Sequence, residues 1–161
     1  MKKFFITAIG AFLAFQLSAQ DFTELKGVML KDSVEYADAV PKILECSEYL
    51  LSTSVKNDEN QLVAYDYLVE WLNNNPYYQF QPNKKLYKII GSNASLTARY
   101  FASLCQIAID NKYEISNDEL QYQAIDKFVR FCMYKKYKVE VDKRLQKYID
   151  AKKNGKLKEM I

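Results

Sequence analysis

The chain of 161 residues contains no histidine, only 4 glycines and only 3 prolines. Without histidine there is no Ser-His-Asp or Cys-His catalytic arrangement and no metal site with histidine ligands. The sequence also has no Gly-rich phosphate-binding loop, and we expect no cofactor. Catalysis by a pair of carboxylates, as in glycoside hydrolysis, is the route that these absences leave open.

Cysteine is also scarce, and its count of three is odd for an exported protein. Cys46, Cys105 and Cys132 each fall on the apolar side of a predicted helix, where a thiol packs as a small hydrophobic group. We therefore expect three free, buried thiols. The alternative is one disulfide with a spare thiol, and Cys105 with Cys132 is then the favoured pair because they lie on consecutive helices.

Residues 1–19 have the pattern of a secretory signal peptide. Lys2 and Lys3 form its charged region, residues 4–15 form an apolar run too short to span a membrane comfortably, and small residues follow. We expect cleavage after Ala19 or Gln20. The sequence thus predicts a periplasmic or secreted protein, with residues 20–161 as one helical domain and no transmembrane segment after cleavage.

Charge divides the remaining chain into two parts. Residues 21–134 contain 11 basic and 16 acidic residues, whereas residues 135–158 contain 10 basic and 3 acidic residues. The C-terminal end is therefore a distinct electrostatic feature of the domain.

The most apolar stretch is residues 94–112, where apolar side chains cover much of the circumference of the predicted helix. Leu96, Tyr100, Leu104 and Ala108 form one row, and Phe101, Cys105 and Ile109 form a second. Such a helix belongs inside a bundle. We therefore expect an all-α, single-domain bundle of about six or seven helices around this central helix.

The other helices are predicted from the helical spacing of apolar residues and from capping residues. We expect a helix over residues 22–37, and then a second one capped by Asp38 or continuous with the first through a kink at Pro41. A third runs from Leu62 to Leu72, with Tyr65 and Val69 on its apolar face, and a short one ends at Gly91. Residues 116–132 begin with a Ser116–Glu119 capping box, and a basic last helix carries Val141, Leu145, Tyr148 and Ile149 before Asn154-Gly155.

Three segments together resemble a known family. They are residues 49–52 (YLLS), residues 71–80 from Trp71 through Pro76 to Phe80, and residues 150–157 (DAKKNGKL). With these segments the chain is similar to an uncharacterised family of secreted, mostly helical proteins of Gram-negative bacteria. In the family a small residue precedes the proline and an acidic one follows it, where this chain has Asn75 and Tyr77. The resemblance implies a helical fold and export, and it implies no activity.

Two surface features are candidate binding sites. Tyr77 and Tyr78 lie with Phe80 in the non-helical segment after Trp71, and the chain is rich in tyrosine, with 13 residues. Tyrosine anchors partners because it has an apolar body and a polar tip. The second feature is the basic C-terminal region, represented by Lys135, Lys136, Lys152 and Lys153. Each feature also has a purely structural explanation. The tyrosines can lie at the edge of the core, and the lysines can belong to a solvated basic helix.

These features favour a non-enzymatic interaction or structural module. Its partner is then an anionic envelope component or another exported protein, and we expect no nucleic acid because the aromatics do not alternate with the lysines. The alternative is a carbohydrate-active hydrolase that uses a carboxylate pair, such as Asp66 with Glu70 or Asp110 with Glu114. A pocket with two facing acids would favour the enzyme, and an aromatic or basic surface would favour the binding protein.

Overall fold

The structure, a computed structural model, describes residues 21–56, 58–81 and 83–161. Within these residues it has eight α-helices, two short 3₁₀-helices and no strand, which confirms the all-α prediction. The predicted signal peptide lies outside the described residues, as do Asn57 and Pro82.

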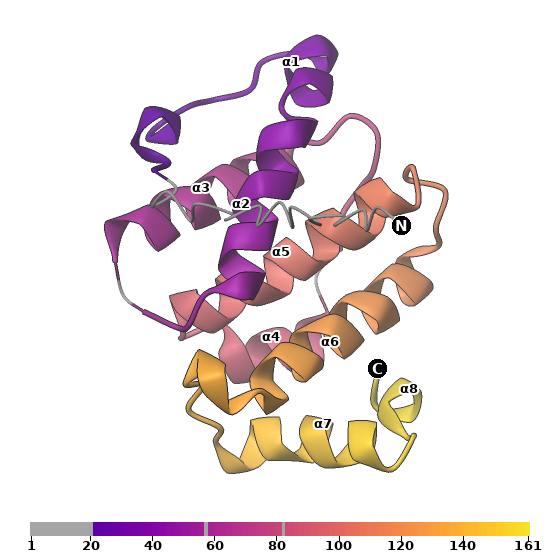
Figure 1. Cartoon of the computed structure of the whole chain (residues 1–161). Coiled ribbons are helices and arrows are strands. Elements are labelled where there is room, and N and C mark those ends of the chain that lie inside the picture. Colours follow the sequence, from indigo (N-terminus) through magenta and orange to yellow (C-terminus); the bar gives the residue numbers. More distant parts are fainter. Residues whose placement is uncertain (1–20, 57, 82) are drawn as a thin grey trace, which may run out of the picture.

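The central position of one helix is also confirmed. Helix α5 (Ala94–Asp110) packs against α2 (Val40–Ser52), α3 (Glu59–Asn73), α4 (Lys84–Ile90) and α6 (Asn117–Met133). Figure 1 shows α5 running diagonally through the molecule, with α2 and α3 on one side and α6 on the other. Tyr100, Leu104 and Cys105 of α5 are almost completely buried, whereas Phe101 and Ile109 of the predicted second row are only partly buried.

Short polar side chains fix where most of the helices begin. In six helices the residue before the first turn accepts a hydrogen bond from a backbone N–H of that turn, which has no partner inside the helix. These capping residues are Asp32, Asp58, Asn83, Asn93, Ser116 and Asp142. In the predicted capping box, Ser116 accepts from Glu119 N–H as expected, but the Glu119 carboxylate binds Gln123 and Lys158 instead.

The C-terminal helices form an outer layer on α6. Helix α7 (Lys143–Lys153) packs on α6 and on α8 (Leu157–Met160), as Figure 1 shows at its lower edge. Leu145, Tyr148 and Ile149 are buried there, as predicted, and Gly155 ends α7 with a φ of +69°. The prediction for Val141 was wrong: it precedes the capping residue of α7 and is 37% exposed.

The N-terminal helix prediction was wrong over most of its length. Residues 22–37 form a 3₁₀-helix (Thr23–Leu25), a bend at Gly27 with a φ of +73°, an extended segment and the short α1 (Ser33–Asp38). Asp38 is the last residue of α1 and does not cap α2, which begins almost at once at Val40. The kinked, nearly continuous alternative therefore describes α1 and α2.

The buried face of α3 is rotated from the predicted one. Leu62 is 42% exposed and Tyr65 and Val69 are partly buried, whereas Gln61 and Tyr67 are buried. The predicted face followed the aliphatic residues, but buried Gln61 binds Arg99 of α5 and the Ser54 carbonyl, which fixes the rotation of the helix.

The three cysteines are free and buried, as predicted. Cys105 lies near Cys46 and Ser47 of α2, and Cys132 lies near Arg99 of α5. The neighbour of Cys105 is therefore Cys46, and the packing gives no support to a Cys105–Cys132 pair.

Candidate functional site

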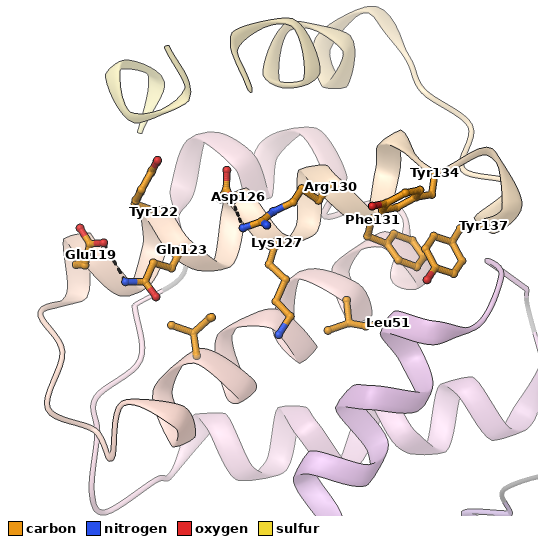
Figure 2. A pocket seen from close by; sticks show the side chains of 11 residues that line it. Leu51, Glu119, Tyr122, Gln123, Asp126, Lys127, Arg130, Phe131, Tyr134 and Tyr137 are labelled. Atoms are coloured by element: carbon orange, nitrogen blue, oxygen red, sulfur yellow. Dashed lines mark hydrogen bonds and ion pairs between the residues drawn. The ribbon is translucent and has the colours of Figure 1, made fainter. Parts of the chain in front are cut away.

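A groove of about 660 Å³ lies along one side of α6, and we call it the α6 groove. Leu51 at the end of α2 and Ile107 of α5 line it with aliphatic side chains, and the remaining side chains come from α6, from Tyr134 and from the 3₁₀-helix Lys135–Tyr137. Figure 2 shows most of these side chains around the groove. Those side chains are Glu119, Tyr122, Gln123, Asp126, Lys127, Arg130, Phe131, Tyr134 and Tyr137.

Helix α6 has two different faces. The groove residues and the core residues each recur every three to four positions, but they lie on different sides of the helix. Leu120, Ala124 and Phe128 point into the bundle and are fully buried. The groove residues recur at spacings of three and four along the helix, which places them on one face. The polar and aromatic side chains of α6 therefore lie on this side, where the groove opens between α6, α5 and the end of α2.

Lys127 extends into the middle of the α6 groove, toward the side chain of Leu51 (Figure 2). The lysine is partly buried, and among the described residues its ammonium group makes no hydrogen bond or ion pair. Burial lowers its pKa, which the charge of Asp110 partly offsets and the charge of nearby Arg130 reinforces. The groove thus contains a cation whose charge is incompletely compensated.

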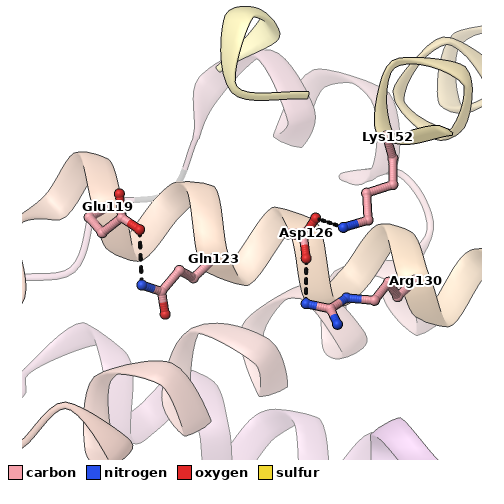
Figure 3. A network of polar contacts seen from close by, with 5 residues as sticks. All are labelled: Glu119, Gln123, Asp126, Arg130 and Lys152. Carbon is pink, nitrogen blue, oxygen red and sulfur yellow. Dashed lines mark hydrogen bonds and ion pairs between the residues drawn. The ribbon is translucent and has the colours of Figure 1, made fainter. Parts of the chain in front are cut away.

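The two carboxylates of the groove are, by contrast, engaged in polar contacts (Figure 3). Asp126, which is 6% exposed, binds Arg130 through one oxygen and Lys152 of α7 through the other. Glu119 accepts a hydrogen bond from Gln123 at 2.9 Å and lies 3.2 Å from Lys158. These contacts lower the pKa of Glu119, with the Gln123 hydrogen bond as the largest cause. Both acids therefore serve to attach α7 and α8 to α6.

Aromatic rings close one end of the groove. The rings of Phe131 and Tyr137 are stacked with centroids 4.2 Å apart, and Tyr134 meets Tyr137 edge to face. The Lys136 ammonium lies 4.7 Å from the centroid of the Tyr137 ring. The Tyr137 carbonyl accepts a hydrogen bond from Val55 N–H, which fixes this end of the groove to the loop after α2.

Behind this aromatic end lies the buried Arg99 of α5, whose guanidinium is 5.7 Å from the centroid of the Phe131 ring. It donates hydrogen bonds to the carbonyls of Ser95 and Ser54 and to the Gln61 side chain. Burial lowers its pKa to about 10. Arg99 thus connects α5 with α3 and the loop after α2, and it supports the groove from behind.

A second hollow of about 570 Å³ adjoins the groove and shares Glu119 and Tyr122 with it. Its deepest polar group, Gln121, accepts a hydrogen bond from the Tyr100 hydroxyl and donates one to the Gln81 carbonyl. Because the Gln121 side chain already makes these hydrogen bonds, the α6 groove is the better candidate for ligand binding.

The predicted tyrosine site lies elsewhere, on the turn after α3. The Tyr77 hydroxyl donates to the Ser33 carbonyl at 2.8 Å, and its ring stacks on Tyr113. The Tyr78 hydroxyl donates to the Ile115 carbonyl at 3.1 Å. Tyr77 is 46% exposed and Tyr78 is partly buried, so these residues attach the turn to α1 and to the α5–α6 connection.

The predicted basic surface is divided between the two ends of the C-terminal region. Lys135 and Lys136 are exposed beside the aromatic end of the α6 groove, while Lys152 and Lys153 end α7. Lys153 is exposed, but Lys152 is partly buried in its ion pair with Asp126. Lys135 and Lys136 therefore lie exposed beside the groove, whereas Lys152 is bound by the groove residue Asp126 and Lys153 lies apart at the end of α7.

The predicted carboxylate pairs lie outside the groove. Asp66 is exposed, and Glu70 accepts a hydrogen bond from Leu30 N–H, which attaches the N-terminal segment to α3. In the part of the chain that the structure describes, no group of three metal-binding side chains is present. None of the helices in the same residues combines the length and apolar character needed to cross a bilayer.

Comparison of the chain with models of known protein families, with curated protein sequences and with solved structures gave no match. The resemblance to a secreted family therefore stays a prediction, and the function has to be inferred from the groove itself.

Sequence reasoning missed the groove residues Tyr122, Lys127, Arg130, Tyr134 and Tyr137. The apolar stripe of α6 dominated its pattern, and a mixed stripe of tyrosine, lysine and arginine resembles an ordinary solvated face. The available signal was a second stripe at helical spacing that continued past the end of α6 into an aromatic, basic segment.

Proposed function

We propose that the protein is an exported, non-enzymatic interaction module that binds an anionic partner through the α6 groove. The observation that carries this proposal is the groove itself, in which aromatic side chains surround Lys127, a cation without a bonded partner among the described residues. Aromatic and basic groups together are typical of surfaces that recognise partners. The partner is an anionic envelope component or another exported protein.

The environment of the groove carboxylates supports a binding role over hydrolysis. A general acid for glycoside cleavage needs a raised pKa, which an apolar environment supplies. Glu119 has a lowered pKa instead, and Asp126 is bound by Arg130 and Lys152. The chain also lacks histidine, the commonest general base.

The charge around the groove supports an anionic partner. Lys135, Lys136 and Lys138 are exposed next to the aromatic end, whereas residues 21–134 carry more acidic than basic side chains. A local cluster of cations attracts an anionic partner over a Debye length of about 8 Å at physiological salt.

A co-sedimentation experiment with isolated envelopes tests this proposal. We expect binding at low salt, and we expect most of it to be lost at about 0.5 M salt because the interaction is screened. Changing Lys135, Lys136 and Lys138 together to glutamine should weaken binding about threefold or more, since each exposed ion pair contributes about 0.2 to 1 kcal/mol. Lys152 is left unchanged because it holds α7 on α6.

The matched control changes three exposed lysines on other parts of the surface, Lys31, Lys85 and Lys88, to glutamine. It removes the same charge, so its binding should stay close to that of the wild type if the position of the charge matters. Equal losses in both variants would show a general charge effect, and an absence of binding to envelopes and exported proteins would refute the proposed function.

Export is tested by the intact mass of the natively expressed protein. We expect a mature chain that begins at Gln20 or Asp21 and is found in the periplasmic or culture fraction, because residues 1–19 have the pattern of a cleaved signal peptide. A mass that retains residues 1–19 would contradict this part of the proposal.

A further inference from the structure

Lys127 differs from the other charged residues that line the middle of the α6 groove. Asp126 and Arg130 bind each other, and Glu119 is bound by Gln123 and Lys158. Lys127 is partly buried without such a contact among the described residues, whereas Arg130 on the next turn is exposed. A cation that is partly removed from water and lacks a counter-ion destabilises the folded state, and an anionic ligand relieves that cost.

The charges that face Lys127 define what the ligand must supply. Asp110 of α5 acts on it from a distance that allows no ion pair, and Arg130 repels it. A carboxylate placed between Lys127 and Arg130 interacts favourably with both cations. Such an anion also forms a charge-assisted hydrogen bond with the Lys127 ammonium, which has three donors.

The rings of Phe131, Tyr137 and Tyr122 each have a covered face, and of the four groove rings only that of Tyr134 is largely exposed, which leaves little aromatic surface for stacking a sugar chain. Tyr137 stacks on Phe131, and the Lys136 ammonium lies over the Tyr137 ring. The Lys158 ammonium lies 5.0 Å from the centroid of the Tyr122 ring. Stacking of a sugar requires an open aromatic face, whereas a peptide needs hydrogen bonds and apolar contacts, which the tyrosine hydroxyls and edges can provide.

The aliphatic residues of the groove also suit a peptide. Leu51 and Ile107 are aliphatic and partly buried, and the Lys127 side chain extends toward Leu51 (Figure 2). An aliphatic side chain of a ligand would bury apolar area here, next to the cation. The groove thus pairs a site for an apolar group with a site for an anion, as in clefts that hold a ligand by a few placed polar groups.

We propose that the α6 groove binds an acidic peptide segment of another exported protein, with one carboxylate on Lys127 and a neighbouring aliphatic side chain on Leu51 and Ile107. This inference rests on the proposed function, because it names the partner of the same groove. It goes further by assigning Lys127 as the anchor of the ligand.

The test uses the purified protein and a library of fluorescein-labelled hexapeptides that combine acidic, aliphatic and neutral polar residues. Fluorescence anisotropy should show the tightest binding for peptides with aspartate or glutamate beside leucine, isoleucine or valine. The best peptide is then compared with its version carrying glutamine for glutamate, which should bind at least tenfold more weakly.

The matched protein variants are Lys127→Met and Lys88→Met. Lys127→Met should weaken binding of the acidic peptide at least tenfold and should discriminate much less between the acidic and the glutamine peptide, because Arg130 is then the only groove cation left near the carboxylate. Lys88 of α4 is exposed and outside the groove, so Lys88→Met should bind like the wild type. The urea midpoint of Lys127→Met should be unchanged or raised, which shows that lost binding does not come from unfolding.

Three outcomes would overturn the inference. They are a library without preference for acidic residues, equal binding by Lys127→Met and the wild type, and binding of a polyuronate such as alginate with no binding of any peptide. Envelope association that is salt-sensitive but unaffected by Lys127→Met would refute this anchor and leave the proposed function standing.

Discussion

Trp71→Ala is expected to lower the free energy of unfolding by about 3 to 5 kcal/mol, the usual cost of removing a large buried aromatic side chain. The indole is 0% exposed, and its N–H donates a hydrogen bond to the Tyr36 carbonyl at 3.2 Å. Its ring lies 5.6 Å from that of Phe80 and 6.2 Å from that of Tyr113, centroid to centroid. The substitution therefore leaves a cavity where α3, the turn after it and the end of α5 meet.

Urea unfolding followed by circular dichroism measures this loss, and Phe80→Ala is the matched comparison. Phe80 is only partly buried, so its truncation should cost about 1 to 2 kcal/mol. A loss below about 1 kcal/mol in Trp71→Ala would show that the turn does not depend on this contact.

The sequence was sufficient for the elements whose signals are local and strong. The apolar rows of α5 and the stripe of α6 predicted both helices, because burial on one face produces a period of 3.6 residues. Ser116 and Gly155 marked helix ends because capping is a property of a few neighbouring residues.

The errors arose where distant residues decide the structure. The segment 22–37 has an amphipathic pattern, but Phe22 N–H binds Asn60 and Leu30 N–H binds Glu70, which holds the backbone along α3 in a non-helical form. Gly27 then adopts a positive φ that a helix does not contain. Tertiary contacts thus overrode a moderate helical pattern, which sequence period alone does not reveal.

The candidate site was hidden for the same reason. Leu51, Ile107 and Lys127 lie on three helices, and only packing brings them to one groove. Arg99 was equally invisible, since a lone arginine in an apolar helix gives no hint that Gln61 and the Ser54 carbonyl will receive its hydrogen bonds. The sequence located the basic residues of the C-terminal region, but it did not show that Asp126 binds Lys152 and so removes this lysine from the exposed basic surface.

The free energy of unfolding should fall with rising pH in the alkaline range, and it should fall more steeply than ionisation of the tyrosines alone would cause, because the three thiols are buried. Burial raises the pKa of Cys46 and of Cys132 from 9.0 to about 12, and it raises the pKa of Cys105 well above its ordinary value. Below pH 9 the thiols are protonated in both folded and unfolded chains, so they contribute no pH dependence. Above pH 9 the unfolded chain loses protons that the folded chain retains, so stability falls as pH rises toward 12.

Each thiol contributes a slope of about 1.4 kcal/mol per pH unit once it ionises in the unfolded chain, and three contribute about 4 kcal/mol per unit. Since a domain of this kind is stable by about 5 to 15 kcal/mol, unfolding should be complete by about pH 12. Buried tyrosines such as Tyr100 also have raised pKa values, so the thiol contribution is obtained from the difference between urea midpoints of the wild type and of Cys132→Ala measured between pH 9 and 10. The slope of Cys132→Ala should be smaller by up to about 1.4 kcal/mol per pH unit, and identical slopes would contradict the prediction.

The same thiols can be counted directly with a chromogenic thiol reagent. Native protein at pH 7.5 should react slowly, because Cys46 and Cys105 are 0% exposed and Cys132 is 6% exposed, and because only the thiolate reacts. In denaturant without reductant, three thiols should react at once. One reactive thiol would reveal a disulfide, and the thiol contribution to the alkaline slope would then be that of a single group. The two measurements therefore have to agree if buried, protonated thiols stabilise this bundle below pH 9.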